Sequence, residues 1–95
     1  MKIEDLSPLL QVSVEIYKMQ LKKEKASITK LRKTLSNINI QETINKGLDL
    51  GAIKIEWISK NGGFLSYYYI NPEMEILIQR ICIDLGEIEI KVKDK

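Results

Sequence analysis

The stretch from Ile53 to Pro72, IKIEWISKNGGFLSYYYINP, constrains the fold of this chain more than any other. Asn61-Gly62 lies between two runs that are rich in Ile, Tyr, Phe and Trp. Asn-Gly favours a type I′ turn, because that turn needs positive φ at both central residues. The sequence therefore predicts an antiparallel β-hairpin with three leading cross-strand pairs: Ile53 with Ile70, Ile55 with Tyr68, and Trp57 with Ser66.

Side chains alternate across a strand, so the hairpin has two faces of different character. One face is expected to be buried and carries Ile53, Ile55, Trp57, Phe64, Tyr68 and Ile70. The other face is amphipathic and carries Lys54, Glu56, Ile58, Leu65, Tyr67 and Tyr69. Trp57 and Tyr68 are therefore expected in the core rather than as a stacking platform for bases. Tyr67 and Tyr69 could cover a core edge, form a dimer contact or line a ligand site.

Capping residues divide the rest of the chain into helices, which must supply what a lone hairpin packs on. The N-caps predicted are Ser7, Ser27, Asn39 and Asn71. The helices are expected over residues 8 to about 23, 28–35, 39–50 and 72–85, with Ser36 to Ile38 as the turn between the second and third. Glu42 stands three residues after Asn39, which is capping-box spacing. Gly51 and Gly86 end the last two helices.

Helical periodicity predicts which side chains face the core. The first helix has two neighbouring apolar stripes, one of Leu9, Val12, Ile16 and Met19 and one of Leu10, Val14, Tyr17 and Leu21. This is wider than one small core requires, so either the domain nearly envelops the helix or one stripe meets a second subunit. In the third helix the inward residues are Ile40, Ile44 and Leu48, and Gly47 suggests close packing against a neighbouring helix. In the fourth they are Met74, Leu77, Ile78, Ile81 and Leu85, while Ile76 and Ile83 point elsewhere.

Composition limits the classes of function. The 95 residues are 44% apolar and 29% charged, which is typical of one globular domain. We expect this domain to span residues 1–86, with 87–95 as a tail or a short added strand. No apolar run is long enough to cross a bilayer, and the N-terminus lacks the apolar core of a signal peptide, so the cytoplasm is expected. The single cysteine, Cys82, fits a reducing compartment.

Nothing in the sequence points to catalysis or to a cofactor. The chain has no histidine, which excludes catalytic triads and imidazole acid–base chemistry. One cysteine cannot build the usual zinc sites, and no phosphate-binding GxxxxGK pattern follows a strand. An enzyme is therefore not expected. Cys82 is interpreted as a small buried hydrophobe, although a redox sensor in a dimer interface is an alternative.

In element order, and over Ile28 to Ile53 in particular, the chain resembles winged helix-turn-helix transcription regulators. Those proteins commonly read "I..LA..L", a turn, a helix, and then "L..LG.I" leading into the wing. Ile28, Leu31 and Leu35 match the first part, and Leu50-Gly51-Ala52-Ile53 match the last. The chain looks like small one-domain regulators of the multiple-antibiotic-resistance and arsenical-resistance types, including short forms from archaea and their viruses. It departs from them in a shorter turn and in Gly47, where the pattern usually has Leu.

The resemblance implies an α+β, mostly helical fold, a winged helix-turn-helix with three helices, a hairpin wing and a fourth helix, that binds duplex DNA as a homodimer. The third helix would lie in the major groove, with base contacts from Gln41, Thr43, Asn45 and Lys46. Contacts to the DNA backbone would come from Lys30, Arg32 and Lys33, and from Lys60 and Asn61 at the wing tip. The dimer interface is expected to use apolar residues of helices one and four: Leu10, Val14, Tyr17, Leu21, Ile76 and Ile83.

Two other readings remain open. The lysines from Lys22 to Lys33 could form an ordinary solvated face, and the net charge is only +2. Winged-helix folds also serve as protein–protein interaction modules, and Glu42 and Asp49 on the third helix would repel phosphate. A small-molecule effector would fit only at a dimer interface in so small a domain.

Overall fold

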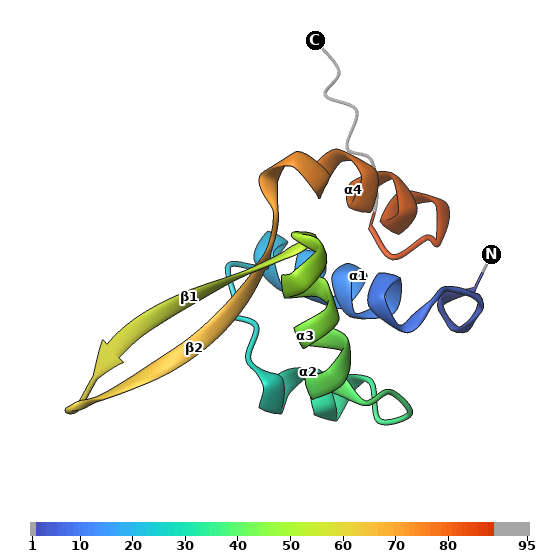
Figure 1. The fold of residues 1–95 in the computed structure, drawn as a ribbon. Coiled ribbons are helices and arrows are strands. Elements are labelled where there is room, and N and C mark those ends of the chain that lie inside the picture. The colour runs from blue at the N-terminus through green and yellow to red at the C-terminus, as the bar shows by residue number, and fades with distance from the viewer. Residues whose placement is uncertain (1, 89–95) are drawn as a thin grey trace, which may run out of the picture.

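A computed structural model describes residues 2–88 of the chain, and the fold is α+β and mostly helical. The elements in order are η1 (Ile3–Asp5), α1 (Pro8–Leu21), α2 (Ile28–Thr34), α3 (Ile40–Leu50), β1 (Ile53–Lys60), β2 (Gly63–Ile70), η2 (Pro72–Met74) and α4 (Glu75–Asp84). Helix α1 lies at the centre, with α4 on one side and α2 and α3 on the other (Figure 1).

The hairpin forms with the predicted register. Ile53 pairs with Ile70, Ile55 with Tyr68 and Trp57 with Ser66. Asn61 and Gly62 have φ of 51° and 80°, as a type I′ turn requires. The two strands project far beyond the helices as a free arm (Figure 1). We call this hairpin, residues 53–70, the wing.

The predicted helix caps hold, with two differences of detail. Ser7, Ser27 and Asn39 each accept a hydrogen bond from a first-turn N–H. The Glu42 carboxylate accepts from the Asn39 side-chain amide at 3.3 Å, so the predicted bond to the Asn39 backbone is replaced. Asn71 and Pro72 open the short 3₁₀ turn η2, and α4 proper starts only at Glu75.

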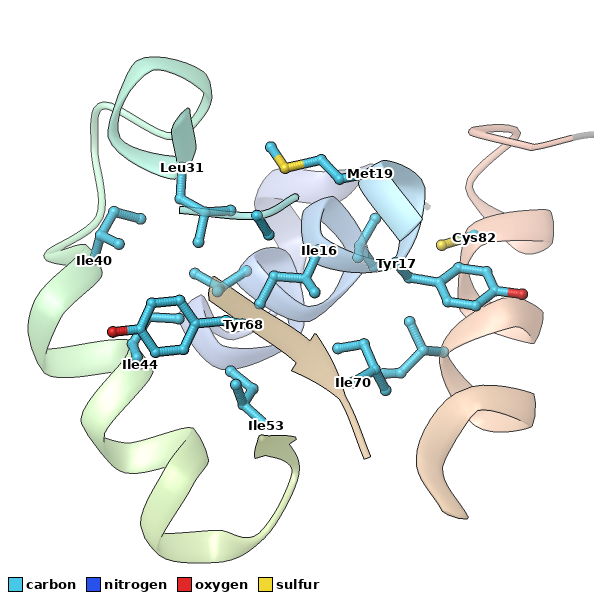
Figure 2. Packing of buried hydrophobic residues seen from close by; sticks show 14 residues of the cluster. Ile16, Tyr17, Met19, Leu31, Ile40, Ile44, Ile53, Tyr68, Ile70 and Cys82 are labelled. Carbon is cyan, nitrogen blue, oxygen red and sulfur yellow. The ribbon is translucent and has the colours of Figure 1, made fainter. Parts of the chain in front are cut away.

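The core gathers around α1, which the domain nearly envelops (Figure 2). Val12, Val14 and Ile16 are fully buried, and Tyr17 points toward α4 beside Cys82. From the wing, the base residues Ile53, Tyr68 and Ile70 enter this core. The domain thus nearly envelops the middle of α1, which is the first of the two possibilities for its double stripe. In the second stripe Val14 and Tyr17 are buried, Leu10 is half-buried, and Leu21 at the end of the helix is exposed.

Gly47 allows α3 to approach the wing closely. A Cβ placed there would lie 2.5 Å from Ile53 Cδ1 and 3.1 Å from Leu9 Cδ1. Close packing was expected, but the nearest neighbour is the first residue of β1 rather than another helix. Because residue 47 has no side chain, β1 can start in close contact with α3.

Trp57 and Leu77 were expected inside, and this is wrong. Trp57 is 64% exposed and Leu77 is 52% exposed, and Phe64 on the same wing face as Trp57 is 73% exposed. Alternation assigned the face of the wing correctly, yet the helices cover only its base. Leu77 lies beside Ile76 on the outer side of α4.

Two contacts that the sequence did not indicate fix the wing to the body. The Tyr68 N–H donates to Ala26 O at 2.9 Å, so the connector between α1 and α2 adds a one-residue bridge to β2. The Ile70 N–H donates to Gln20 Oε1 at 2.7 Å. Both bonds satisfy backbone groups on the outer edge of β2, which would otherwise be costly to bury.

Candidate nucleic-acid interface

Helix α3 presents a polar face to solvent. Ile40 and Ile44 are buried, so Gln41, Asn45 and Lys46 point outward as predicted. Gln41 Nε2 donates to Asn45 Oδ1 at 3.1 Å, which aligns two amide side chains one turn apart on the exposed surface. Amide side chains in this position can bond to base edges in a major groove.

Thr43 does not belong to this face, which corrects one predicted base contact. It is only 8% exposed, and its hydroxyl donates to Asn39 O at 2.8 Å. The residue stabilises the first turn of α3 from the inside. A base contact from Thr43 would require the helix to rotate out of the core.

The cations of α2 are free for an anionic partner. Lys30, Arg32 and Lys33 are exposed, and none of them takes part in an ion pair within residues 2–88. Lys25 differs, because its Nζ lies 3.3 Å from Glu56 Oε2. Of the basic stretch singled out in the sequence, the part on α2 therefore keeps its positive charge available to a partner.

Lys60, the last residue of β1, and Asn61 of the turn are both exposed. The end of the hairpin that they form stands away from the helices (Figure 1). The wing starts directly after α3, with Gly51 in the left-handed conformation at φ 76° as the junction. The amide of Asn71 donates to Gly51 O at 2.7 Å and ties the end of β2 to this junction. The wing is thus held at its base, and its tip extends into solvent.

Acidic residues share the exposed side of α3. Glu42 and Asp49 are both exposed, against the single cation Lys46. The outward face of α3 is therefore slightly acidic overall. Net attraction to DNA phosphates would have to come from α2 and the wing, because Glu42 and Asp49 outnumber Lys46 on α3.

The predicted dimer residues separate into three groups. Val14 and Tyr17 are buried against α4, so they have no surface to offer a partner, and their assignment to an interface is wrong. Leu10 and Ile83 are half-buried. Leu21 and Ile76 are exposed, and Ile76 borders a shallow groove of about 420 Å³ with Gln79, Arg80, Ile83 and Asp84.

Two further hollows lie among the described residues. One of about 380 Å³ separates the starts of α1 and α3 and is lined by Ser7, Pro8, Asn37, Glu42 and Lys46, among others. The other, of about 360 Å³, runs beside the outer edge of β2, where Tyr67 and Tyr69 face Gln20 and the Lys25–Glu56 pair. The tyrosines thus line a surface recess within one chain.

Cys82 and Lys18, which lie between α1 and α4, both have raised pKa values. Burial raises the pKa of the Cys82 thiol to about 11, which keeps it protonated and unreactive. Burial opposes the charge of Lys18, but hydrogen bonds to Glu15 and Glu87 outweigh it and raise its pKa. The small buried hydrophobe expected at Cys82 is confirmed.

Within residues 2–88 no group of His, Cys, Asp and Glu side chains is placed to hold a metal ion. None of the helices in that range is long and apolar enough to cross a membrane. The expected tail falls largely on residues 89–95, which lie outside the described residues. Ile88 still packs against the core cluster.

Comparisons with known proteins identify no family for the chain. A scan against protein-family models found no match for the chain. Searches of curated proteins and of solved structures found no significant match either. The order of helices and strands is compatible with a winged helix, and the residues that face solvent are the remaining guide to function.

Proposed function

We propose that the protein is a winged-helix regulator of transcription that binds duplex DNA as a homodimer. The observation that carries the proposal is the exposed amide pair of α3, Gln41 and Asn45, on a helix that directly precedes a free hairpin. In this arrangement α3 enters the major groove, and Lys46 meets an adjacent phosphate.

Unpaired cations on two other elements support the proposal. Lys30, Arg32 and Lys33 on α2 and Lys60 at the wing tip are exposed without an acidic partner in the described part of the chain. Phosphate contacts of this kind position a protein on the duplex, and base contacts specify the sequence. The two sets of residues therefore have different roles and different signatures in binding experiments.

The homodimer is best supported by the outer face of α4. Ile76 is 79% exposed and Leu77 is 52% exposed, and the groove beside them includes both Arg80 and Asp84. A two-fold pairing of these faces would bury four large side chains and set two copies of α3 toward two half-sites. In sedimentation experiments, Ile76→Glu should give monomers. Leu50→Glu, at an exposed apolar residue of α3 outside the predicted interface, is the control and should leave the dimer intact.

The first test is fluorescence anisotropy of a mixed-sequence duplex titrated with the protein between about 50 and about 200 mM salt. Wild type should bind with an affinity that falls steeply over this range. Lys30→Ala/Arg32→Ala/Lys33→Ala should weaken binding to every sequence and reduce the salt slope by about 0.9 for each lost phosphate contact. Lys2→Ala, which removes an exposed lysine outside α2, α3 and the wing, is the control. Equal binding by the triple variant and wild type at every salt concentration would contradict the role of α2.

The second test addresses sequence preference, on a site selected from a random-sequence pool. Gln41→Ala and Asn45→Ala should each lower discrimination between bases by about 1–3 kcal/mol without changing the salt slope. Because the two amides bond each other, the double variant should lose less than the sum of the single losses. Unaltered base preference in both single variants would contradict the placement of α3 in the groove.

A protein–protein interaction module is the second candidate, and one observation favours it. Exposed Glu42 and Asp49 make the outward face of α3 slightly acidic, and large apolar side chains are exposed on the wing and on α4. If the protein shows no salt-dependent retention on DNA or heparin and forms a stable complex with another protein, this candidate replaces the first.

A further inference from the structure

The outer face of η2 and α4 carries two opposite charges placed symmetrically around an apolar pair. Ile76 and Leu77 form the pair and are 79% and 52% exposed. Glu73 stands three residues before Ile76, Arg80 stands three residues after Leu77, and both are exposed. The junction of η2 and α4 has right-handed helical backbone angles, and side chains at these helical spacings share one face. We call Glu73, Ile76, Leu77 and Arg80 the α4 stripe.

Both charges of the α4 stripe are available to a partner. Neither Glu73 nor Arg80 takes part in an ion pair within residues 2–88. Arg80 also lines the hollow of about 420 Å³ on α4. Asp84, one turn further on, lines the same hollow but forms no ion pair with Arg80. The stripe thus presents an acid at one end, a cation at the other and apolar side chains between them.

A stripe with opposite charges at its two ends is complementary to a second copy of itself turned end to end. Consider two α4 helices that pack antiparallel about a two-fold axis between Ile76 and Leu77. Ile76 of each copy then lies against Leu77 of the other, and Glu73 of each copy faces Arg80 of the other, so every contact is made twice. In a parallel pairing each side chain would face its own copy. Two Arg80 side chains and two Glu73 side chains would then meet, and like charges in contact are unfavourable.

From this symmetry we infer that Glu73 and Arg80 set the direction and register of the α4 pairing, through two Glu73–Arg80 ion pairs across the two-fold axis. The inference rests on the homodimer of the proposed function and names the residues that make that pairing specific. Charges at the rim of an interface contribute mainly to partner choice and register, and the apolar pair at its centre contributes affinity. The hollow beside Arg80 leaves room for the carboxylate of the second copy's Glu73.

Asp84 offers a competing register, in which it would pair with Arg80 of the second copy. The two-fold axis would then pass beside Cys82, which is fully buried in its own chain. Ile76 and Leu77 of the two copies would no longer meet, and both side chains would stay in water. The register through Glu73 covers the apolar pair and pairs the charges at the same time, which favours it over the register through Asp84.

Charge exchange tests the register, with association measured by sedimentation equilibrium in the absence of DNA. Arg80→Glu and Glu73→Arg should each weaken the homodimer about tenfold, because two exposed ion pairs become two contacts between like charges. An equimolar mixture of these two variants should associate about as tightly as wild type, since each ion pair re-forms between one copy of each. Both sites are exposed, so circular dichroism should show both variants folded.

Asp84→Arg is the matched control, because it reverses the other exposed charge at the hollow. Mixed with Arg80→Glu, it should associate less tightly than the mixture of Arg80→Glu and Glu73→Arg. If the mixture with Asp84→Arg associates as tightly as wild type and the mixture with Glu73→Arg does not, the register through Asp84 is correct and the inference is overturned.

Failure of this inference is distinguishable from failure of the proposed function. If wild type dimerises, Ile76→Glu is monomeric, and both charge variants dimerise as tightly as wild type, the charges do not set the register and the proposed homodimer stands. If wild type is a monomer at every concentration, with and without DNA, the homodimer and the inference both fail.

Discussion

The two halves of the wing have nearly the same kind of sequence and opposite environments. At the base, Ile53, Tyr68 and Ile70 are buried, and Ile70 has no exposed surface. In the distal half, Trp57 and Phe64 are largely exposed although they occupy the same face. Residue type and alternation therefore do not decide burial in this arm. What decides it is how far α1 and α3 reach along the strands.

Among substitutions in the wing, those at its base should lower the free energy of unfolding most. Ile70→Ala removes a fully buried side chain and should lower the free energy of unfolding by about 2–5 kcal/mol. Phe64→Ala, in the distal half, should change it by less than about 0.5 kcal/mol. Urea denaturation of both variants measures the difference. Similar losses in the two variants would mean that the distal half is covered in solution.

The second-largest loss of unfolding free energy is expected when the hydrogen bond from the Ile70 N–H to Gln20 is removed. Gln20→Leu leaves this N–H without its acceptor and should lower the free energy of unfolding by about 1–3 kcal/mol. Hydrogen exchange at the Ile70 amide should accelerate in the same variant. Gln79→Leu, on the exposed side of α4, is the control. Unchanged exchange at Ile70 would show that the bond is not a significant attachment of the wing.

Substitution of Gly47 tests the contact between α3 and the base of the wing. Gly47→Ala gains helix propensity but places Cβ 2.5 Å from Ile53 Cδ1, so we expect a net loss of about 1–2 kcal/mol of unfolding free energy. In a double-mutant cycle, Ile53→Val removes that methyl and should relieve part of the added loss, because Ile53 Cγ1 would still lie 2.9 Å from the new Cβ. Gly63→Ala has open space around it and should be nearly neutral. Additive losses for residues 47 and 53 would argue against direct contact.

A small effect is expected from the exposed ion pair in the middle of the arm. The Lys25–Glu56 ion pair is exposed on both sides, so Lys25→Ala should cost less than about 1 kcal/mol. A double-mutant cycle with Glu56→Ala, measured by urea denaturation at low and high salt, should show a coupling that salt reduces. A larger, salt-independent coupling would place the pair in a drier environment than its exposure indicates.

Much of the fold could be predicted because it depends on local chemistry. The register follows from Asn61-Gly62, and the helix starts follow from Ser7, Ser27 and Asn39. The outward positions of Gln41 and Asn45 follow from the burial of Ile40 and Ile44, four residues apart. Each of these inferences uses residues only a few positions apart in the chain.

The errors come from relations between distant segments. Whether Trp57 is covered depends on the reach of the helices, and whether Val14 is free depends on α4, far along the chain. The bridge at Ala26 and the acceptor at Gln20 have no local signature at all, since either residue suits an ordinary helix end or connector. Thr43 was predicted on the exposed face of α3 although it is buried. A short polar side chain at the border between the two faces of a helix can point to solvent or to the core.

The bridge between Ala26 and Tyr68 has a mechanical consequence. Ala26 immediately precedes Ser27, the N-cap of α2, so the backbone bond that holds the connector against β2 also sets where α2 begins. A tilt of the wing would pull on Ala26 and move the start of α2 with it. The orientation of the wing and the start of the helix that carries the α2 cations are thus linked through a single backbone hydrogen bond.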